Sequence, residues 1–174
     1  MVELARSIHI VPVEEHERKM RRQHSELKEI WDLLDLVKDP EVPVLSLWDL
    51  GVLQDVREQA DSMVISITPT YSGCPALRSM RDDIVEVLHA NGYKNVRIET
   101  RLSPAWTTDW LSESARRQLR EYGISAPVKH LDQVICPQCG SSATRLVSEF
   151  GSTACKALYR CGDCQEPFDY FKTI

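Results

Sequence analysis

Residues 63–88 read MVISITPTYSGCPALRSMRDDIVEVL, and this stretch contains a strand, a loop and a helix in succession. Residues 63–67 form a short apolar run that is typical of a β-strand. After the loop Thr68–Pro75, apolar residues return at the spacing of one helical face: Leu77, Met80, Ile84 and Leu88. Asn91 and Gly92 are predicted to end this helix, because glycine tolerates the left-handed backbone found there.

The segments on either side of this stretch complete a small fold. A helical pattern covers residues 25–38, with Ser25 as the predicted N-cap and Pro40 beyond its end. Residues 52–56 are predicted to form a strand that makes a hairpin with residues 63–67, and Val96–Ile98 a third strand. The order α-β-β-α-β predicts an α+β sandwich with its helices packed on one small sheet.

The sequence divides into three predicted parts: a polar tail over 1–24, an α+β domain over 25–125, and a cysteine module over 126–174. The tail ends in a basic stretch, which favours a solvated segment over a binding arm. A helix over 112–122 follows a connector that contains Trp106 and Trp110. These two tryptophans either form a partner-binding surface or cover the sheet as core, and the sequence leaves both alternatives open.

Composition narrows the class of protein. The formal net charge of -5 argues against a general nucleic-acid binder. No apolar run approaches the roughly 18 residues needed to cross a bilayer, and the N-terminus lacks a secretory pattern. We therefore expect a cytoplasmic protein with no nucleic-acid or membrane partner. In that compartment, paired cysteines more often bind metal than form disulfides.

Five of the six cysteines lie after residue 135. Four of them form two C-x-x-C pairs, Cys136/Cys139 and Cys161/Cys164, separated by 21 residues. This spacing predicts a zinc-ribbon-like module with a four-thiolate metal site, zinc being the first choice and iron its rival. Such a closed site is usually structural. Cys155 is either a small buried thiol, or a fifth thiol that can exchange into the cluster or receive a metal next to Lys156 and Arg160, whose charges favour the thiolate.

Cys74 stands apart from the other cysteines, in the loop before a predicted helix. Backbone N–H groups at a helix start favour the thiolate, so this setting predicts a reactive thiol. The alternative is an ordinary buried cysteine under a helix start. A thiol redox enzyme would need a resolving cysteine, and none is close to Cys74 in sequence.

Three oxygen-bearing residues are candidates to work with Cys74. Asp39 and Glu41 flank a proline and can supply hard oxygen ligands or a proton acceptor; alternatively, Asp39 ends the first helix and Glu41 is solvated. Thr68 can hydrogen-bond either the loop backbone or a bound group. Asp49, just before Leu50-Gly51, is predicted to shape a turn.

Two motifs of the first domain occur together: Asp39-Pro-Glu with Asp49-Leu-Gly, and the Thr68–Pro75 loop with its Gly-Cys-Pro. The pair resembles the SufT-like domain of iron–sulfur cluster assembly factors. The connector over 102–110 and the ribbon segments over 151–161 and 166–172 extend the resemblance. From residue 25 to 174 the chain resembles the PaaD family of accessory subunits, which accompany the multicomponent phenylacetyl-CoA epoxidase.

The resemblance implies a specific function. The epoxidase uses a di-iron oxygenase and a reductase that carries flavin and a [2Fe–2S] cluster. The chain lacks the paired Glu and Glu-x-x-His helical motifs of a di-iron carboxylate site, and it lacks a G-x-G-x-x-G fingerprint, so it is expected to be neither enzyme. The family implies an accessory factor that matures the iron or iron–sulfur centre of a reductase or oxygenase partner, with Cys74 holding iron or a cluster transiently. The alternative is a structural scaffold subunit, and an edge strand permits a homodimer.

Overall fold

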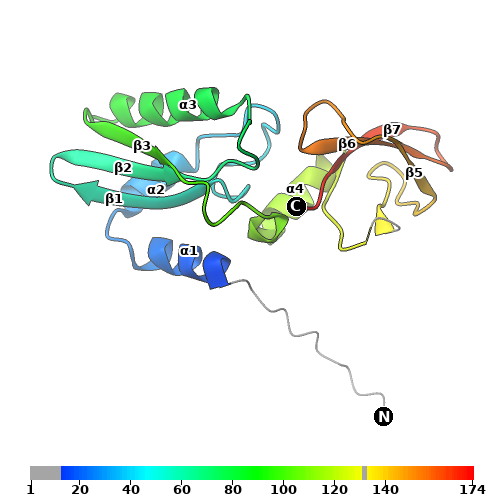
Figure 1. The fold of residues 1–174 in the computed structure, drawn as a ribbon, viewed down its shortest axis with the longest axis horizontal. Coiled ribbons are helices and arrows are strands. Elements are labelled where there is room, and N and C mark those ends of the chain that lie inside the picture. The colour runs from blue at the N-terminus through cyan, green and yellow to red at the C-terminus, as the bar shows by residue number, and fades with distance from the viewer. Residues whose placement is uncertain (1–12, 131–132) are drawn as a thin grey trace, which may run out of the picture.

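The computed structural model describes residues 13–130 and 133–174, which form two lobes, each built around its own sheet (Figure 1). The first lobe contains a three-stranded sheet of order β1-β2-β3 with helices packed against it. Its elements are α1 (Val13–His24), α2 (Lys28–Leu34), β1 (Leu53–Gln59), β2 (Ser62–Ile67), α3 (Leu77–Ala90) and β3 (Val96–Thr100). From α2 onward this order confirms the predicted α+β fold.

The register of the first sheet fixes where the Cys74 loop emerges. β1 and β2 pair antiparallel, with Leu53 opposite Ile67, and β3 runs parallel to β2. A parallel pair needs a crossover connection, and α3 supplies it. Helices α2 and α3 contact each other, so they cover the same face of the sheet. The loop with Cys74 therefore leaves the end of β2 and enters the start of α3.

Residues 13–24 form helix α1, so the prediction of a solvated tail is wrong for this segment. Arg18 is only 1% exposed. Its guanidinium donates hydrogen bonds to the carbonyl oxygens of Trp48 (3.0 Å), Leu53 (3.2 Å) and Trp110 (3.1 Å). Burial lowers the pKa of Arg18 to about 10, which leaves the side chain charged at neutral pH. Residues 1–12 of the predicted tail lie outside the described residues.

Helix α2 is shorter than predicted, and Ser25 is not its N-cap. The cap position is Leu27, which provides no side-chain hydrogen bond. Ser25 Oγ instead accepts the N–H of Leu27 at 3.1 Å, in the turn that joins α1 to α2. The new helix α1 explains the difference, because the chain must reverse direction between the two helices before α2 begins.

The tryptophan connector belongs to the core. Trp106 and Trp110 are 3% and 1% exposed, and Trp106 Nε1 donates to the carbonyl oxygen of Leu50 at 3.0 Å. The core alternative is therefore correct for both tryptophans. The short helix η1 (Thr108–Trp110) leads into α4 (Glu113–Glu121), which Ser112 caps by accepting the N–H of Ala115.

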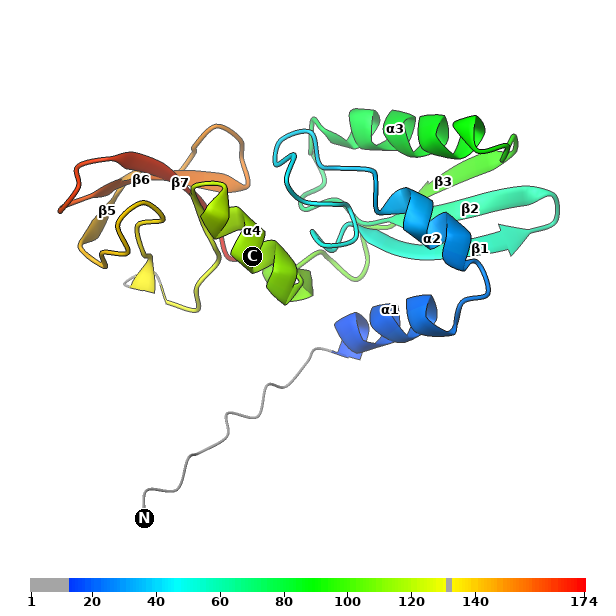
Figure 2. The same ribbon diagram turned by 180° about the vertical axis from the view of Figure 1, so that it is seen from behind.

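The second lobe contains a four-stranded sheet of order β4-β7-β6-β5. Its strands are β4 (Ile124–Ser125), β5 (Thr144–Ser148), β6 (Lys156–Cys161) and β7 (Pro167–Phe171). Helix α4 lies between the two lobes in both views (Figures 1 and 2). Four residues of this half of the chain join the buried cluster of the first lobe: Ile124, Ala126, Cys155 and Phe171. The two lobes therefore share one apolar core. Among the described residues, no helix combines the length and apolarity needed to cross a membrane.

Candidate metal centres

The four predicted ribbon cysteines lie together at the end of the second lobe. Their sulfur atoms all lie within 4.8 Å of one another. Cys136 Sγ is 3.7 Å from Cys164 Sγ, and Cys139 Sγ is 3.6 Å from Cys161 Sγ. Four thiolates arranged tetrahedrally at the roughly 2.3 Å bond length of zinc lie about 3.8 Å apart. The two short distances match that value, so the four sulfur atoms are grouped closely enough to hold a four-coordinate metal ion.

Backbone groups shape the two turns that carry these cysteines. The N–H of Gly140 donates to the carbonyl oxygen of Cys136 at 2.9 Å, and Gly140 has a φ of +75° that favours glycine. Hydrogen bonds from the backbone N–H of Cys164 and then of Asp163 lower the pKa of Cys161 to about 6. These donors stabilise a thiolate at the position where a metal ligand must lose its proton.

Cys74 lies in the turn between β2 and α3 and is 8% exposed. Burial raises the pKa of its thiol; a hydrogen bond from the N–H of Ala76 opposes this, and the charges of Glu41 and Asp39 add to it. The expectation that the helix start favours the thiolate is therefore wrong for the resting protein. Helix α3 begins only at Leu77, so one N–H acts on the sulfur, and it cannot outweigh burial and two carboxylates.

A shallow hollow at the surface reaches Cys74. It is lined by Cys74, Pro75, Leu77, Arg78, Arg81 and Asp82. The thiol is thus mostly covered but forms part of a wall that opens to solvent. A small ion or a partner's thiol can approach it from this side.

Asp39 and Glu41 have different roles in the structure. Asp39 is 4% exposed, and its Oδ1 accepts the N–H groups of Glu41 at 2.8 Å and Val42 at 2.7 Å. It therefore shapes the loop, and burial raises the pKa of its carboxyl. Glu41 instead turns toward the second lobe, where its Oε2 lies 3.9 Å from Cys155 Sγ. Both carboxylates lie close enough to Cys74 to raise the pKa of its thiol.

Cys155 does not lie with the ribbon cysteines. It is 4% exposed, in the turn before β6, and its Sγ is 3.0 Å from Thr153 Oγ1. The extended chain of β6 separates it from Cys161, a span of about 20 Å. The alternative in which Cys155 exchanges into the ribbon cluster is therefore wrong, because the thiol is at the opposite end of β6. It is buried, as the other alternative predicted, but in the core shared with the first lobe.

The other two predicted residues support the loop. Thr68 is 3% exposed and its N–H donates to the carbonyl oxygen of Val52 at 2.8 Å. Asp49 accepts hydrogen bonds from the hydroxyls of Ser46 at 2.9 Å and Ser112 at 2.6 Å. Asp49 shapes its turn as predicted and also ties it to helix α4.

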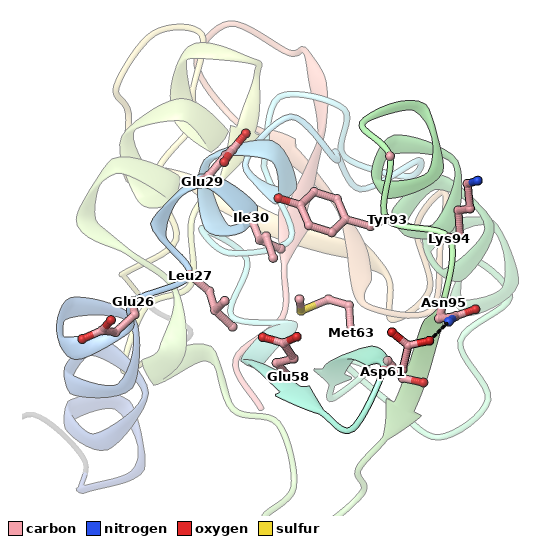
Figure 3. A pocket seen from close by; sticks show the side chains of 12 residues that line it. Glu26, Leu27, Glu29, Ile30, Glu58, Asp61, Met63, Tyr93, Lys94 and Asn95 are labelled. Carbon is pink, nitrogen blue, oxygen red and sulfur yellow. Dashed lines mark hydrogen bonds between the residues drawn. The ribbon is translucent and has the colours of Figure 1, made fainter.

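A separate open groove lies between the start of α2, the β1–β2 turn and the segment after α3 (Figure 3). Its charged lining is mainly acidic: Glu26, Glu29, Glu58 and Asp61, with Lys94 at its edge. Asp61 accepts a hydrogen bond from Asn95 at 2.9 Å. None of the predicted site residues lines this groove.

Comparison with known proteins matches both lobes. Residues 27–99 match the family model of an iron–sulfur cluster assembly protein, and residues 124–172 match that of the PaaD zinc beta ribbon domain. An Escherichia coli (strain K12) protein assigned as a subunit of 1,2-phenylacetyl-CoA epoxidase is 52% identical over 155 residues, covering 86% of this chain and 94% of that protein.

Further relatives match the first lobe. An Fe-S protein maturation auxiliary factor of Porphyromonas gingivalis is 35% identical over 94 residues, covering 53% of this chain and 89% of that protein. The crystal structure of domain of unknown function DUF59 from Bacillus anthracis covers 60% of this chain and 95% of its own, at 23% identity and a TM-score of 0.49.

Fold, site and family models together define the class of protein: an iron–sulfur-assembly-type α+β domain joined to a four-cysteine β-ribbon. The high identity along nearly the whole of the Escherichia coli relative is more specific. The chain belongs to the PaaD family of 1,2-phenylacetyl-CoA epoxidase subunits, as the sequence motifs indicated.

Proposed function

We propose that this protein is a non-catalytic accessory factor of a phenylacetyl-CoA epoxidase system, and that it matures the iron–sulfur centre of a partner subunit. One observation carries the proposal: a domain of the iron–sulfur assembly family presents a buried loop thiol, Cys74, beside the carboxylates of Asp39 and Glu41. The relationships to an epoxidase subunit and to an Fe-S maturation factor support it.

The Cys74 site suits transient holding of iron or a cluster. Thiolate and carboxylate ligands together accept iron, and Thr68 lies at the base of the same loop. A site with few protein ligands keeps coordination positions free, so its cargo can leave for a client. The role does not require catalysis by this chain, and the cytoplasm, where thiols stay reduced, is the compartment that suits it.

The ribbon has a different role in this proposal. Its four thiolates fill every position of a tetrahedral ion and leave no place for a substrate, so the ion stabilises the fold. We propose zinc as that ion. Metal analysis of anaerobically purified protein should find one zinc per chain and no colour, whereas a brown protein with iron in the ribbon contradicts this assignment.

The ribbon also offers a surface for docking the client. Strand β5 and the following turn expose Leu146, Val147 and Phe150, at 46%, 51% and 67% of their surfaces. Exposed apolar side chains on an edge strand favour contact with another chain. The reductase or the oxygenase of the epoxidase system is the proposed client, and a scaffold role without metal transfer is the competing function.

Replacing Cys74 separates these two functions. The Cys74→Ser variant is produced together with the epoxidase subunits, and the iron and sulfide content of the purified reductase is measured. Maturation predicts a depleted cluster although the variant is folded and still binds its partners. A fully loaded reductase from the same cells contradicts maturation, and with undisturbed co-purification it favours the scaffold.

A further inference from the structure

Cys155 belongs to the ribbon half of the sequence, yet it packs into the core of the first lobe together with Cys74. Its position is fixed by backbone hydrogen bonds on both sides: Lys156 donates its N–H to the carbonyl oxygen of Thr153 at 3.1 Å, and the Cys155 carbonyl accepts the N–H of Lys172 at 2.9 Å. The backbone at the ends of β6 and β7 therefore holds the Cys155 thiol against the first lobe.

Glu41 contacts the ribbon at Cys155 and Lys156. Its carboxylate lies 3.9 Å from Cys155 Sγ, and its backbone carbonyl accepts a hydrogen bond from Lys156 Nζ at 3.3 Å. Lys156 is itself 4% exposed and lies 3.7 Å from a carboxylate oxygen of Asp169. The loop that carries Glu41 is thus fastened to the ribbon, and a cation lies next to it.

The charges that act on Cys74 include those of Glu41 and Cys155. The pKa of its thiol is raised by Glu41, Asp39 and Cys155, after burial. The pKa of the neighbouring Tyr71 hydroxyl is raised, again after burial, by Cys74, Glu41 and Cys155 together. Glu41 and Cys155 are in contact at the boundary between the lobes, and Cys74 belongs to the same buried cluster as Cys155.

This set of ligands has a distinct chemistry. Two thiolates and a carboxylate suit a borderline divalent ion such as ferrous iron, and the nearby ammonium of Lys156 offsets part of their negative charge. Among the described residues, the ribbon cysteines alone form a group of three or more ligand side chains that is already close enough together to hold a metal ion. The Cys74 group must therefore close around its ion by side-chain rotation, which favours weak retention.

We propose that Cys155 is the second thiol ligand of the Cys74 site, and that Cys74, Cys155 and Glu41 bind ferrous iron between the two lobes. The ribbon thereby completes the site of the assembly domain as well as docking a client. The choice of iron rests on the proposed function, whereas the three-ligand site rests on the 3.9 Å contact between Glu41 and Cys155 and on the packing of Cys74 and Cys155 in one buried cluster.

Cobalt(II) is the probe, because thiolate-to-cobalt charge-transfer bands report sulfur ligands directly. The full-length chain with its ribbon zinc in place is titrated with cobalt(II) without oxygen. We expect binding with a thiolate band in the native chain. Cys74→Ser and Cys155→Ser should each weaken binding on the order of 10- to 100-fold and reduce the band; the double variant should lose it.

Two carboxylate variants provide a matched pair. Glu41→Gln should weaken cobalt binding, whereas Glu149→Gln, which changes an exposed carboxylate on the ribbon, should leave it unchanged. The zinc content of every variant is measured, because retained zinc shows that the ribbon is folded. Cys155→Ala is included so that a result does not depend on the polarity of serine alone.

Native affinity and a native band in both Cys155 variants would overturn the site, as would cobalt binding that occurs only by displacement of zinc. The measurement is independent of the client. If Cys155→Ser loses cobalt but still yields a fully loaded reductase, the site stands and the maturation function fails. If only Cys74→Ser depletes the reductase while Cys155→Ser binds cobalt normally, maturation stands and the shared site fails.

Discussion

The four ribbon cysteines and the pair Cys74 and Cys155 differ in how far their ligand atoms are assembled before a metal arrives. In the ribbon, the sulfur–sulfur distances of 3.6 and 3.7 Å already match a tetrahedral ion. Between the lobes, Cys155 Sγ and a carboxylate oxygen of Glu41 lie 3.9 Å apart, and the proposed site with Cys74 has to close around its ion. Preorganisation retains an ion, whereas a site that must close around its ion can release it.

The two lobes also differ in the size of the apolar core that stabilises each of them. The first lobe has a broad apolar core that includes Trp31, Trp110, Ile65 and Leu45, all at most 1% exposed. The separate cluster of the ribbon is small: Val134, Cys136, Ala157, Tyr159, Cys161, Phe168 and Tyr170. Two of its members are cysteines of the proposed zinc site. Metal coordination therefore has to supply the stability that the ribbon's own core lacks.

The largest expected effect is the loss of a ribbon ligand. Cys161→Ser should abolish stoichiometric metal binding and unfold β5 and β6, because binding energies of about 10–16 kcal/mol hold such modules folded. Amide hydrogen exchange should show lost protection in the second sheet, with protection retained in β2 and α3. Native protection of β6 in the zinc-free variant would remove the contrast between metal-held and packing-held lobes.

The next effect tests packing in the first lobe. Gly51 has a φ of +79°, and a Cβ there would lie 2.7 Å from Trp110 Cβ. Gly51→Ala should lower the free energy of unfolding by about 2–4 kcal/mol, the sum of left-handed backbone strain and overpacking. Gly92→Ala is the control, since Gly92 has a φ of +92° and no atom within 4 Å. Denaturant unfolding should give it only the backbone cost; equal losses would contradict the steric explanation.

A somewhat smaller effect is expected at the contact between α1 and the first lobe. Arg18→Met removes the donor to three main-chain carbonyls, two of them in buried hydrogen bonds. Leaving such acceptors unpaired should cost about 1–3 kcal/mol. The matched control is Arg21→Met, because the Arg21 side chain is 38% exposed and makes only long ion pairs. Thermal unfolding of both variants should separate them, and similar midpoints would mean that Arg18 does not anchor α1.

Cys74→Ser should have the smallest effect on stability, although Cys74 is the residue with the largest proposed effect on function. Cys74→Ser places a hydroxyl in a mostly buried position within reach of the Ala76 N–H, so its cost should be about 1 kcal/mol. The free energy of unfolding, measured with zinc bound, should therefore stay near that of the native chain. A loss as large as that of Cys161→Ser would show that Cys74 is a structural residue, and the contrast between the two cysteine groups would disappear.

Local patterns predicted much of this architecture. The hairpin, the helix over Leu77–Ala90 and the ribbon pairs follow from spacing and turn residues, because neighbours along the chain determine them. Helix α1 was missed because its inward face carries Arg18 rather than apolar residues. The pKa of Cys74 was predicted in the wrong direction because burial and two carboxylates that are distant in sequence outweigh the nearest N–H.

The sequence by itself determined the α-β-β-α-β order, the family motifs and the two cysteine pairs of the ribbon, since each depends on local patterns along the chain. Only the tertiary structure decided that the tryptophans are core, that Arg18 anchors α1, and that Cys155 packs in the core of the first lobe rather than beside Cys161. The reason is physical. Strand β6 separates Cys155, in the turn before it, from Cys161 at its far end, and the shared core of the two lobes brings Cys155 to Glu41.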